Sequence, residues 1–303
     1  WVYDRHKSPT EVLTDTAAAC QVREPAYGMI YSLIFQTTAT RVTYSALPKP
    51  SRGPSDRPAA VAGKFYPGNP AEMNAMLDDM LAGDATAEPC KAVMVPHAGW
   101  QFSGKLAADV LKRVRIPERI IAIGPKHTPH GTDWAVAPHH NWVLPEKNVA
   151  SDYALAMKLV ESIDGLEADF NAHQAEHGIE VELPIIARLA PETQVVGITV
   201  GGGDLQRCEQ FADELAGVIR EMDEAPLLLI SSDMNHYAND DETRRLDALA
   251  LADLDRLDED ALFQTCRANH ISMCGMVPAV IILKTLKKLG SIHQSRQAGY
   301  ATS

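Results

Sequence analysis

Long apolar runs are missing from this sequence. No stretch of its 303 residues approaches the roughly 18 consecutive apolar residues that a membrane-spanning helix needs, so we expect no membrane association. The first residues also lack the basic and apolar regions of a secretory signal. The chain starts at Trp1 instead of Met, which indicates a fragment or a processed product.

Basic residues are in the minority. The 28 Lys and Arg face 40 Asp and Glu, and the net charge is −12. Such a chain repels phosphate, whereas nucleic-acid binders usually carry a basic stripe, so we expect no nucleic-acid partner. The local basic cluster of Lys284, Lys287 and Lys288 has helical spacing, and we interpret it as a solvated helix face.

Cysteine is scarce as well. The five cysteines are odd in number and widely spaced, and no CxxC pair occurs, which argues against a disulfide scaffold or a structural zinc site. Free thiols without a signal segment predict a cytoplasmic protein. The sequence contains neither GxGxxG nor a Walker pattern, so Gly201–Gly203 is interpreted as a turn. A CxxxCxxC motif is also missing, so the chain would not itself perform radical chemistry.

What is present is a regular alternation of short apolar runs and segments of helical spacing from Arg57 onward. We expect strands at 92–95, 119–123, 194–200 and 227–231. We expect helices at 71–82, 103–114, 150–163, 179–190, 205–222, 241–257, 258–268 and 277–289, with an irregular section at 124–148. The alternation predicts an α/β fold: a single domain with a central, mostly parallel sheet flanked by helices.

Residues 1–56 differ from the remainder of the chain. A capping box predicts a short helix ending near Ala19, a Thr/Tyr/Val-rich stretch over 30–44 could form strands, and the Pro-rich stretch 48–55 is typical of a linker. We interpret 1–56 as an N-terminal extension of unknown role, followed by one domain over 57–303.

Three of the predicted strands end next to residues that can bind a metal. His97 follows the strand 92–95, His127 follows 119–123, and Asp233 and His236 follow 227–231. In an open α/β sheet, ligands bind outside the carboxyl ends of the strands. If the three strands are neighbours, these side chains meet in one crevice and suit a transition metal. The alternatives are surface-loop histidines and, for Asp233, a helix N-cap.

Two further segments carry candidate groups. Glu176 stands beside His177, and such a carboxylate can fix the tautomer of an imidazole, as it does around metal sites. Glu180 and Glu182 are interpreted as partners of a helix dipole in its first turn. Cys274 precedes a glycine, so no neighbouring side chain blocks an approach to its sulfur.

Read together, several motifs resemble the Memo family, whose prokaryotic members are called AmmeMemoRadiSam system protein B. They occur in family order over 57–303 and comprise Arg57–Pro67, Pro96-His97-Ala98-Gly99-Trp100 with Ser103-Gly104, Gly124–His127, Glu176-His177 through Leu183-Pro184, Ser231-Ser232-Asp233 with His236-Tyr237, and Cys274-Gly275. The resemblance implies the fold of class III extradiol dioxygenases, which are non-haem Fe(II) enzymes. It also implies that family members continue beyond Ser303 through a final strand, so that the domain is truncated here.

The resemblance further assigns the site. His97, His127 and Cys274 match its metal positions, and the candidate catalytic residues Asp233, His236 and His177 match polar residues of the same pocket. Fe(II) is the expected metal, with Cu or Zn possible, because mixed N/S/O ligands suit all three. Cys274 takes the place that a carboxylate holds in the dioxygenases.

The resemblance leaves several functions open. The expected role is metal binding in redox chemistry, or in an undefined prokaryotic pathway with a radical-SAM partner protein. The alternatives are a dioxygenase-like enzyme in which His236 acts as acid or base, and a non-catalytic phosphopeptide-binding adaptor. In each case a small molecule or a peptide would enter the pocket.

Overall fold

The computed structural model describes residues 49–302. The helix expected before Ala19 and the strands expected over 30–44 lie outside the described residues. The compact unit that contains the described part spans residues 47–303. Ser51 and Ser55 of the predicted linker hydrogen-bond to later parts of this unit: Phe170 N–H donates to the Ser51 carbonyl, and His140 N–H donates to the Ser55 carbonyl.

A six-stranded sheet forms the centre, in the order β2-β9-β3-β8-β4-β7. The first four strands run parallel, β4 is antiparallel to β8, and β7 is parallel to β4. The expectation of a mostly parallel sheet is therefore confirmed. The strands are β2 (Ala92–Val95), β3 (Arg119–Pro125), β4 (Trp134–Val136), β7 (Glu167–Ala168), β8 (Gln194–Val200) and β9 (Leu227–Ser231).

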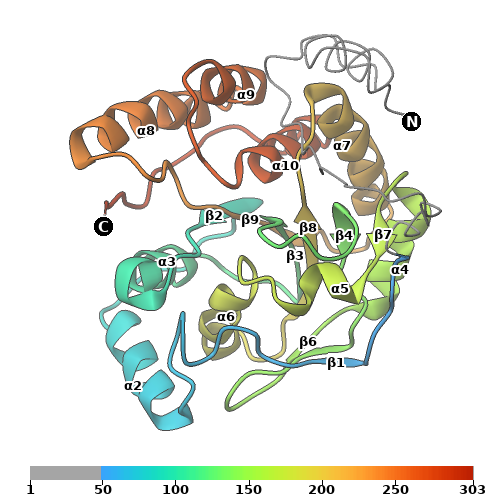
Figure 1. The fold of residues 1–303 in the computed structure, drawn as a ribbon, viewed down its shortest axis with the longest axis vertical. Coiled ribbons are helices and arrows are strands. Elements are labelled where there is room, and N and C mark those ends of the chain that lie inside the picture. The colour runs from blue at the N-terminus through green and yellow to red at the C-terminus, as the bar shows by residue number, and fades with distance from the viewer. Residues whose placement is uncertain (1–48, 303) are drawn as a thin grey trace, which may run out of the picture. The chain divides into compact units, whose positions relative to one another are not determined.

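Helices cover both faces of this sheet (Figure 1). One face packs against α4 (Tyr153–Ser162), α7 (Leu205–Arg220), α8 (Asp240–Asp255), α9 (Glu259–Ala268) and α10 (Met276–Lys288). The other packs against α2 (Pro70–Met80), α3 (Lys105–Leu111) and α6 (Leu183–Leu189). Among the described helices, none combines the length and apolarity that a membrane crossing requires.

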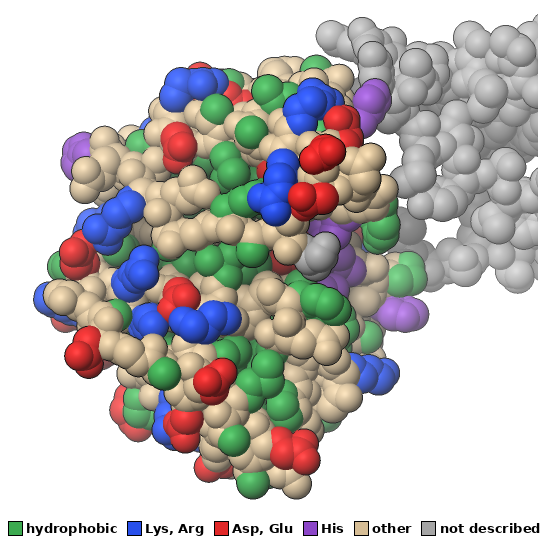
Figure 2. Space-filling model, turned by 90° about the vertical axis from the view of Figure 1, so that its left-hand side faces the viewer, with side chains coloured by type: hydrophobic (Ala, Val, Ile, Leu, Met, Phe, Trp, Pro, Cys, Tyr) green, Lys and Arg blue, Asp and Glu red, His purple; other side chains and the backbone are tan. Residues whose placement is uncertain are grey.

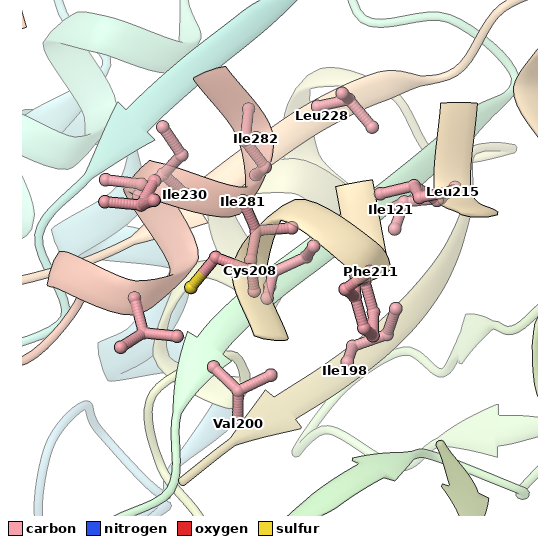
Figure 3. Close-up of a cluster of buried hydrophobic side chains, with 14 of the residues drawn as sticks. Ile121, Ile198, Val200, Cys208, Phe211, Leu215, Leu228, Ile230, Ile281 and Ile282 are labelled. Carbon is pink, nitrogen blue, oxygen red and sulfur yellow. The ribbon is translucent and has the colours of Figure 1, made fainter. Parts of the chain in front are cut away.

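The alternation of side chains along each strand builds the two cores. On β3, Ile121 and Ile123 face the α7–α10 layer, whereas Ile120 and Ala122 face the α2–α3–α6 layer. Figure 3 shows the first core, where Phe211 of α7 and Ile281 of α10 meet the strands. Strands buried on both faces read as continuous apolar runs, which is why the sequence located β2, β3, β8 and β9 well.

The expected irregular section 124–148 contains more structure than its composition indicates. It holds β4 and β5 (Asn141–Trp142), and β5 joins β1 (Asp56–Arg57) and β6 (Val149–Ala150) in a second sheet of three strands. A short helix, α5 (Phe170–Gln174), follows later in the chain. Strands of two or three residues give too short a pattern for periodicity to detect.

Two local expectations were wrong. The helix expected over 103–114 is shorter, because the chain after β2 first forms a π-helical turn, η2 (Trp100–Gly104), in which Ser103 donates its hydroxyl to the Ala98 carbonyl. Lys284 is not solvated: its side chain is 8% exposed and lies within hydrogen-bonding distance of Glu209 and Asp260. Acidic residues on α7 and α9 cover it, which helical spacing on α10 alone could not indicate.

Candidate metal centre

The candidate centre lies where three neighbouring parallel strands end. Because Val95 of β2 pairs with Ser231 of β9, His97 and Asp233 come two residues beyond adjacent strand ends. Asp233 Oδ1 accepts hydrogen bonds from the backbone N–H groups of His97 (2.9 Å) and Ala98 (3.2 Å). On the other side of β9, His127 follows the end of β3 in the same way.

Three imidazoles converge at this edge. One ring nitrogen from each of His97, His127 and His177 lies within 4.8 Å of the others, so the group could hold a metal ion. The rings of His127 and His177 stack, with centroids 4.3 Å apart, and His97 meets both edge-on at 5.1 and 5.3 Å. The sequence placed His177 among the polar residues of the pocket, whereas the geometry puts it level with the other two histidines.

Cys274 joins this group from the loop before α10. Its Sγ lies 3.2 Å from His97 Nε2 and accepts a hydrogen bond from Asp233 N–H at 3.2 Å. Gly275 is needed here for packing: a Cβ at this position would lie 2.2 Å from that of Ser232. The glycine therefore lets the cysteine loop approach β9, which brings the thiol to the imidazoles.

Hydrogen bonds fix the direction in which two of the rings face. Ser231 Oγ donates to the Gly178 carbonyl, so at 2.6 Å from His97 Nδ1 it accepts the proton of that nitrogen. Glu176 Oε1 lies 2.7 Å from His127 Nδ1 and accepts from it in the same manner. Both rings consequently direct Nε2 toward the shared space, which is the orientation that a metal ligand requires.

The electrostatics of the group centre on the pair His127 and Cys274. Burial raises the pKa of Cys274, but hydrogen bonds with His127 and His97 outweigh it and lower the pKa to about 6. Burial lowers the pKa of His127, yet hydrogen bonds to Cys274 and Glu176 raise that pKa to about 10. Without a metal, a thiolate therefore faces an imidazolium at neutral pH, and a cation could replace the shared proton.

The pKa values of Glu176 and His177, which lie beside this pair, are both lowered. The pKa of Glu176 falls to about 2, because hydrogen bonds from His127 outweigh burial, so it stays ionised. Burial and the charges of His127 and His97 lower the pKa of His177 to about 4, so His177 stays neutral. A neutral imidazole is the form that binds a metal.

Asp233 and His236 form the outer side of the centre. Asp233 Oδ2 lies 3.9 Å from His97 Nε2 and 4.0 Å from His236 Nε2. His236 Nδ1 lies 3.0 Å from the Ser272 carbonyl and donates to it, leaving Nε2 free to accept a proton. The next residue, Tyr237, is fully exposed and has a φ of 66°, so the chain turns sharply at the rim.

The sequence indicated neither the contact of Ser231 with His97 nor the burial of Glu180 and Glu182. Both glutamates lie in the first turn of the short 3₁₀ helix Glu180–Glu182, but they are also buried, and Glu180 pairs with Arg57 at 2.6 Å. Burial raises the pKa of Glu182 well above its usual value. Ser231 is the last residue of a buried strand, and only its pairing across the sheet shows that it reaches His97.

Comparison with known proteins identifies the family of this chain. A family model described as Memo-like protein matches residues 57–303. This chain belongs to the Memo-like family. The single α/β domain is the dioxygenase-like fold that the sequence resemblance implied.

Similar proteins come from bacteria and archaea. A MEMO1 family protein of Aquifex aeolicus is 37% identical over 238 residues, covering 78% of this chain and 88% of that protein. One from Methanopyrus kandleri is 31% identical over 262 residues, covering 82% and 92%, and one from Methanobrevibacter smithii is 30% identical over 262 residues, covering 82% and 93%.

Figure 2 shows the surface of one side of the molecule. Histidine side chains (purple) reach the surface there beside acidic and hydrophobic side chains, and positive and negative side chains are interspersed.

Proposed function

We propose that this protein binds a transition-metal ion through His97, His127 and Cys274. The observation that carries the proposal is the convergence of donors: Cys274 Sγ lies 3.2 Å from His97 Nε2, and His97 belongs to a group of three imidazoles that could hold an ion. The donor chemistry fits, because two imidazoles and a thiolate suit first-row transition metals. When bound, the ion supplies Lewis-acid or one-electron redox chemistry.

Fe(II) is the metal we favour, with copper or zinc as the alternatives. The family resemblance supports iron, and the mixture of nitrogen, sulfur and a nearby carboxylate suits all three. His177, a member of the three-imidazole group, and Asp233 Oδ2, 3.9 Å from His97 Nε2, are the two candidates for a further ligand. The site would serve a redox role in a pathway shared with a radical-SAM partner, in a reducing, cytoplasmic setting.

The test is elemental analysis after anaerobic purification. We expect the wild-type protein to hold a transition metal in stoichiometric amount and the double variant His97→Ala/Cys274→Ala to hold none. Circular dichroism checks that the variant is folded. Equal metal content in both proteins would contradict the proposal.

A dioxygenase-like reaction is the second candidate, and the geometry of His236 favours it. Its Nδ1 is fixed by the Ser272 carbonyl, and its free Nε2 stands 4.0 Å from Asp233 Oδ2 at the rim, as an acid or base acting on a bound substrate would. Assays with catechols, Fe(II) and oxygen test it. Ring cleavage that disappears in His236→Ala supports the enzyme, whereas phosphopeptide binding without turnover supports an adaptor.

A further inference from the structure

Glu176 is a buried carboxylate that links the two loops carrying His127 and His177. Its Oε1 accepts from His127 Nδ1 (2.7 Å), from His177 N–H (2.9 Å) and from Gly178 N–H (3.0 Å). Its Oε2 accepts from the backbone N–H of His127 at 2.6 Å. One side chain thus serves both loops, although 49 positions separate it from His127.

We propose that Glu176 is the positioning residue of the metal centre: it fixes the ring of His127 with Nε2 toward the ion and sets the place of His177 beside it. This inference rests on the proposed metal-binding function. Nothing in the family match or in the names of the similar proteins assigns a role to Glu176.

The two halves of the centre are built differently, and this difference makes Glu176 necessary. His97 follows β2, and its loop is tied to β9 through Asp233. His177 follows no strand, since it lies between α5 and η3 (Glu180–Glu182). Within residues 49–302, no backbone hydrogen bond joins the segment 126–128 to 176–178. The contacts through the Glu176 carboxylate supply that link.

Only a carboxylate satisfies this arrangement. The four groups that hydrogen-bond to the Glu176 carboxylate are all N–H donors, and they need acceptors at both of its oxygens. His177 Nδ1 lies farther away, at 3.4 Å from Oε1. A glutamine has the same shape but offers one acceptor oxygen and an NH₂ group. In either orientation of the amide, the NH₂ faces an N–H donor, so at least one loop must move away from the other.

Glu180 provides a matched control on the same segment. It is also buried and accepts from several donors, namely Arg57 Nη1 (2.6 Å), Ala60 N–H (2.8 Å), Val61 N–H (3.0 Å) and Tyr66 Oη (2.8 Å). None of these partners is an imidazole. A carboxylate-to-amide change at Glu180 therefore removes no hydrogen bond to a ring of the centre, although its partner Arg57 also donates to the Glu176 carbonyl.

The experiment compares Glu176→Gln with Glu180→Gln, using Co(II) as the probe. The absorption of Co(II) reports on its ligands, and titration gives the Kd of each metal-free protein under anaerobic conditions. We expect Glu176→Gln to weaken Co(II) binding by about 10- to 100-fold, the usual loss when the partner of a ligating histidine is removed. Glu180→Gln should lower the midpoint of unfolding and leave the Kd of the folded protein unchanged.

A second measurement separates positioning from a general structural effect. In the zinc-loaded wild type, the ¹⁵N spectrum of the histidines should show His127 protonated at Nδ1 and bound to zinc through Nε2. In Glu176→Gln, we expect this signal to broaden or divide, while Glu180→Gln keeps the wild-type spectrum. If Glu180→Gln does not fold, Tyr66→Phe replaces it as a milder control on the same cluster.

The outcomes are distinguishable. A wild-type protein that binds no Co(II) overturns the proposed function itself. Wild-type affinity in Glu176→Gln, or equal losses of affinity in Glu176→Gln and its control, overturns the role of Glu176. If Glu176→Gln does not fold, Glu176→Asp takes its place: it keeps the charge but is too short to reach all four donors, so wild-type affinity there overturns the role as well.

Discussion

Glu176 and Glu180 are buried carboxylates on the same short segment, yet they organise their surroundings in opposite ways. Glu180 accepts hydrogen bonds from the Arg57 guanidinium, the Tyr66 hydroxyl and two backbone N–H groups, so its carboxylate is fully used within the protein. Glu176 also accepts from several donors, but the ring that it fixes, that of His127, hydrogen-bonds to the Cys274 thiol and lies beside two further imidazoles.

The comparison separates a structural cluster from a binding cluster. Arg57 is 1% exposed, and it also donates to the carbonyls of His173 and Glu176, so its hydrogen bonds hold the protein together. The histidine and cysteine group instead keeps donor atoms that converge on one point. A group of donor atoms that point at one another and are not all used in hydrogen bonds indicates a ligand site, whereas burial or charge by itself does not.

Removing the buried ion pair of Arg57 and Glu180 should have the largest effect on stability. Arg57→Leu leaves the buried carboxylate of Glu180 without its cation, and removing one partner of a buried ion pair costs about 3–5 kcal/mol. Urea denaturation followed by fluorescence measures the change. A loss below about 1 kcal/mol, the value for an exposed pair, would show that the cluster does not carry the stability we assign to it.

The group of His127 and Cys274 should instead affect how the stability of the protein depends on pH. The pKa of Cys274, lowered to about 6 from 9.0, contributes stability that is complete above pH 9.0 and is lost as the pH falls through about 6. The pKa of His127, raised to about 10 from 6.5, contributes stability that is complete below pH 6.5 and is lost as the pH rises through about 10.

For the metal-free protein, these two contributions predict a stability maximum between pH 6.5 and 9.0, where the thiolate–imidazolium pair exists only in the folded state. In Cys274→Ser the maximum should flatten, because serine cannot supply the thiolate. Thermal unfolding in a series of buffers, with metal removed by a chelator, gives both profiles. Parallel profiles for the two proteins would show that this pair is not ionised as described.

The smallest effect is expected at the ionic group on α10. Lys287 pairs with Glu259 at 2.5 Å, but its side chain is 44% exposed, so Lys287→Ala should cost less than about 1 kcal/mol. The same urea measurement applies. A loss as large as that of Arg57→Leu would remove the distinction between buried and exposed pairs on which the comparison depends.

The sequence predicted the main elements of the fold because their signals are local. The apolar runs of β2, β3, β8 and β9 are continuous, and the structure gives them bounds equal or close to those expected. The short strands of the second sheet were missed, since two residues define no period. The solvated interpretation of Lys284 failed because the acidic residues that surround it belong to other helices.

What the sequence by itself determined is which residues stand at the strand ends. In a parallel sheet the strand ends gather at one edge, so His97, His127 and Asp233 could be placed together from their positions after apolar runs. Cys274 and His177 were singled out from their neighbours in the sequence, but their place at the same site came only from the family resemblance, because no strand directly precedes them.

Only the tertiary structure decided how these side chains are oriented. Ser231 reaches His97 from 134 positions away, and Glu176 reaches His127 from 49 positions away. Which nitrogen of a ring faces the centre depends on such distant partners, since a hydrogen bond at Nδ1 leaves Nε2 as the ligand atom. No local pattern in the chain encodes that contact, because it exists only when the sheet and its loops are folded.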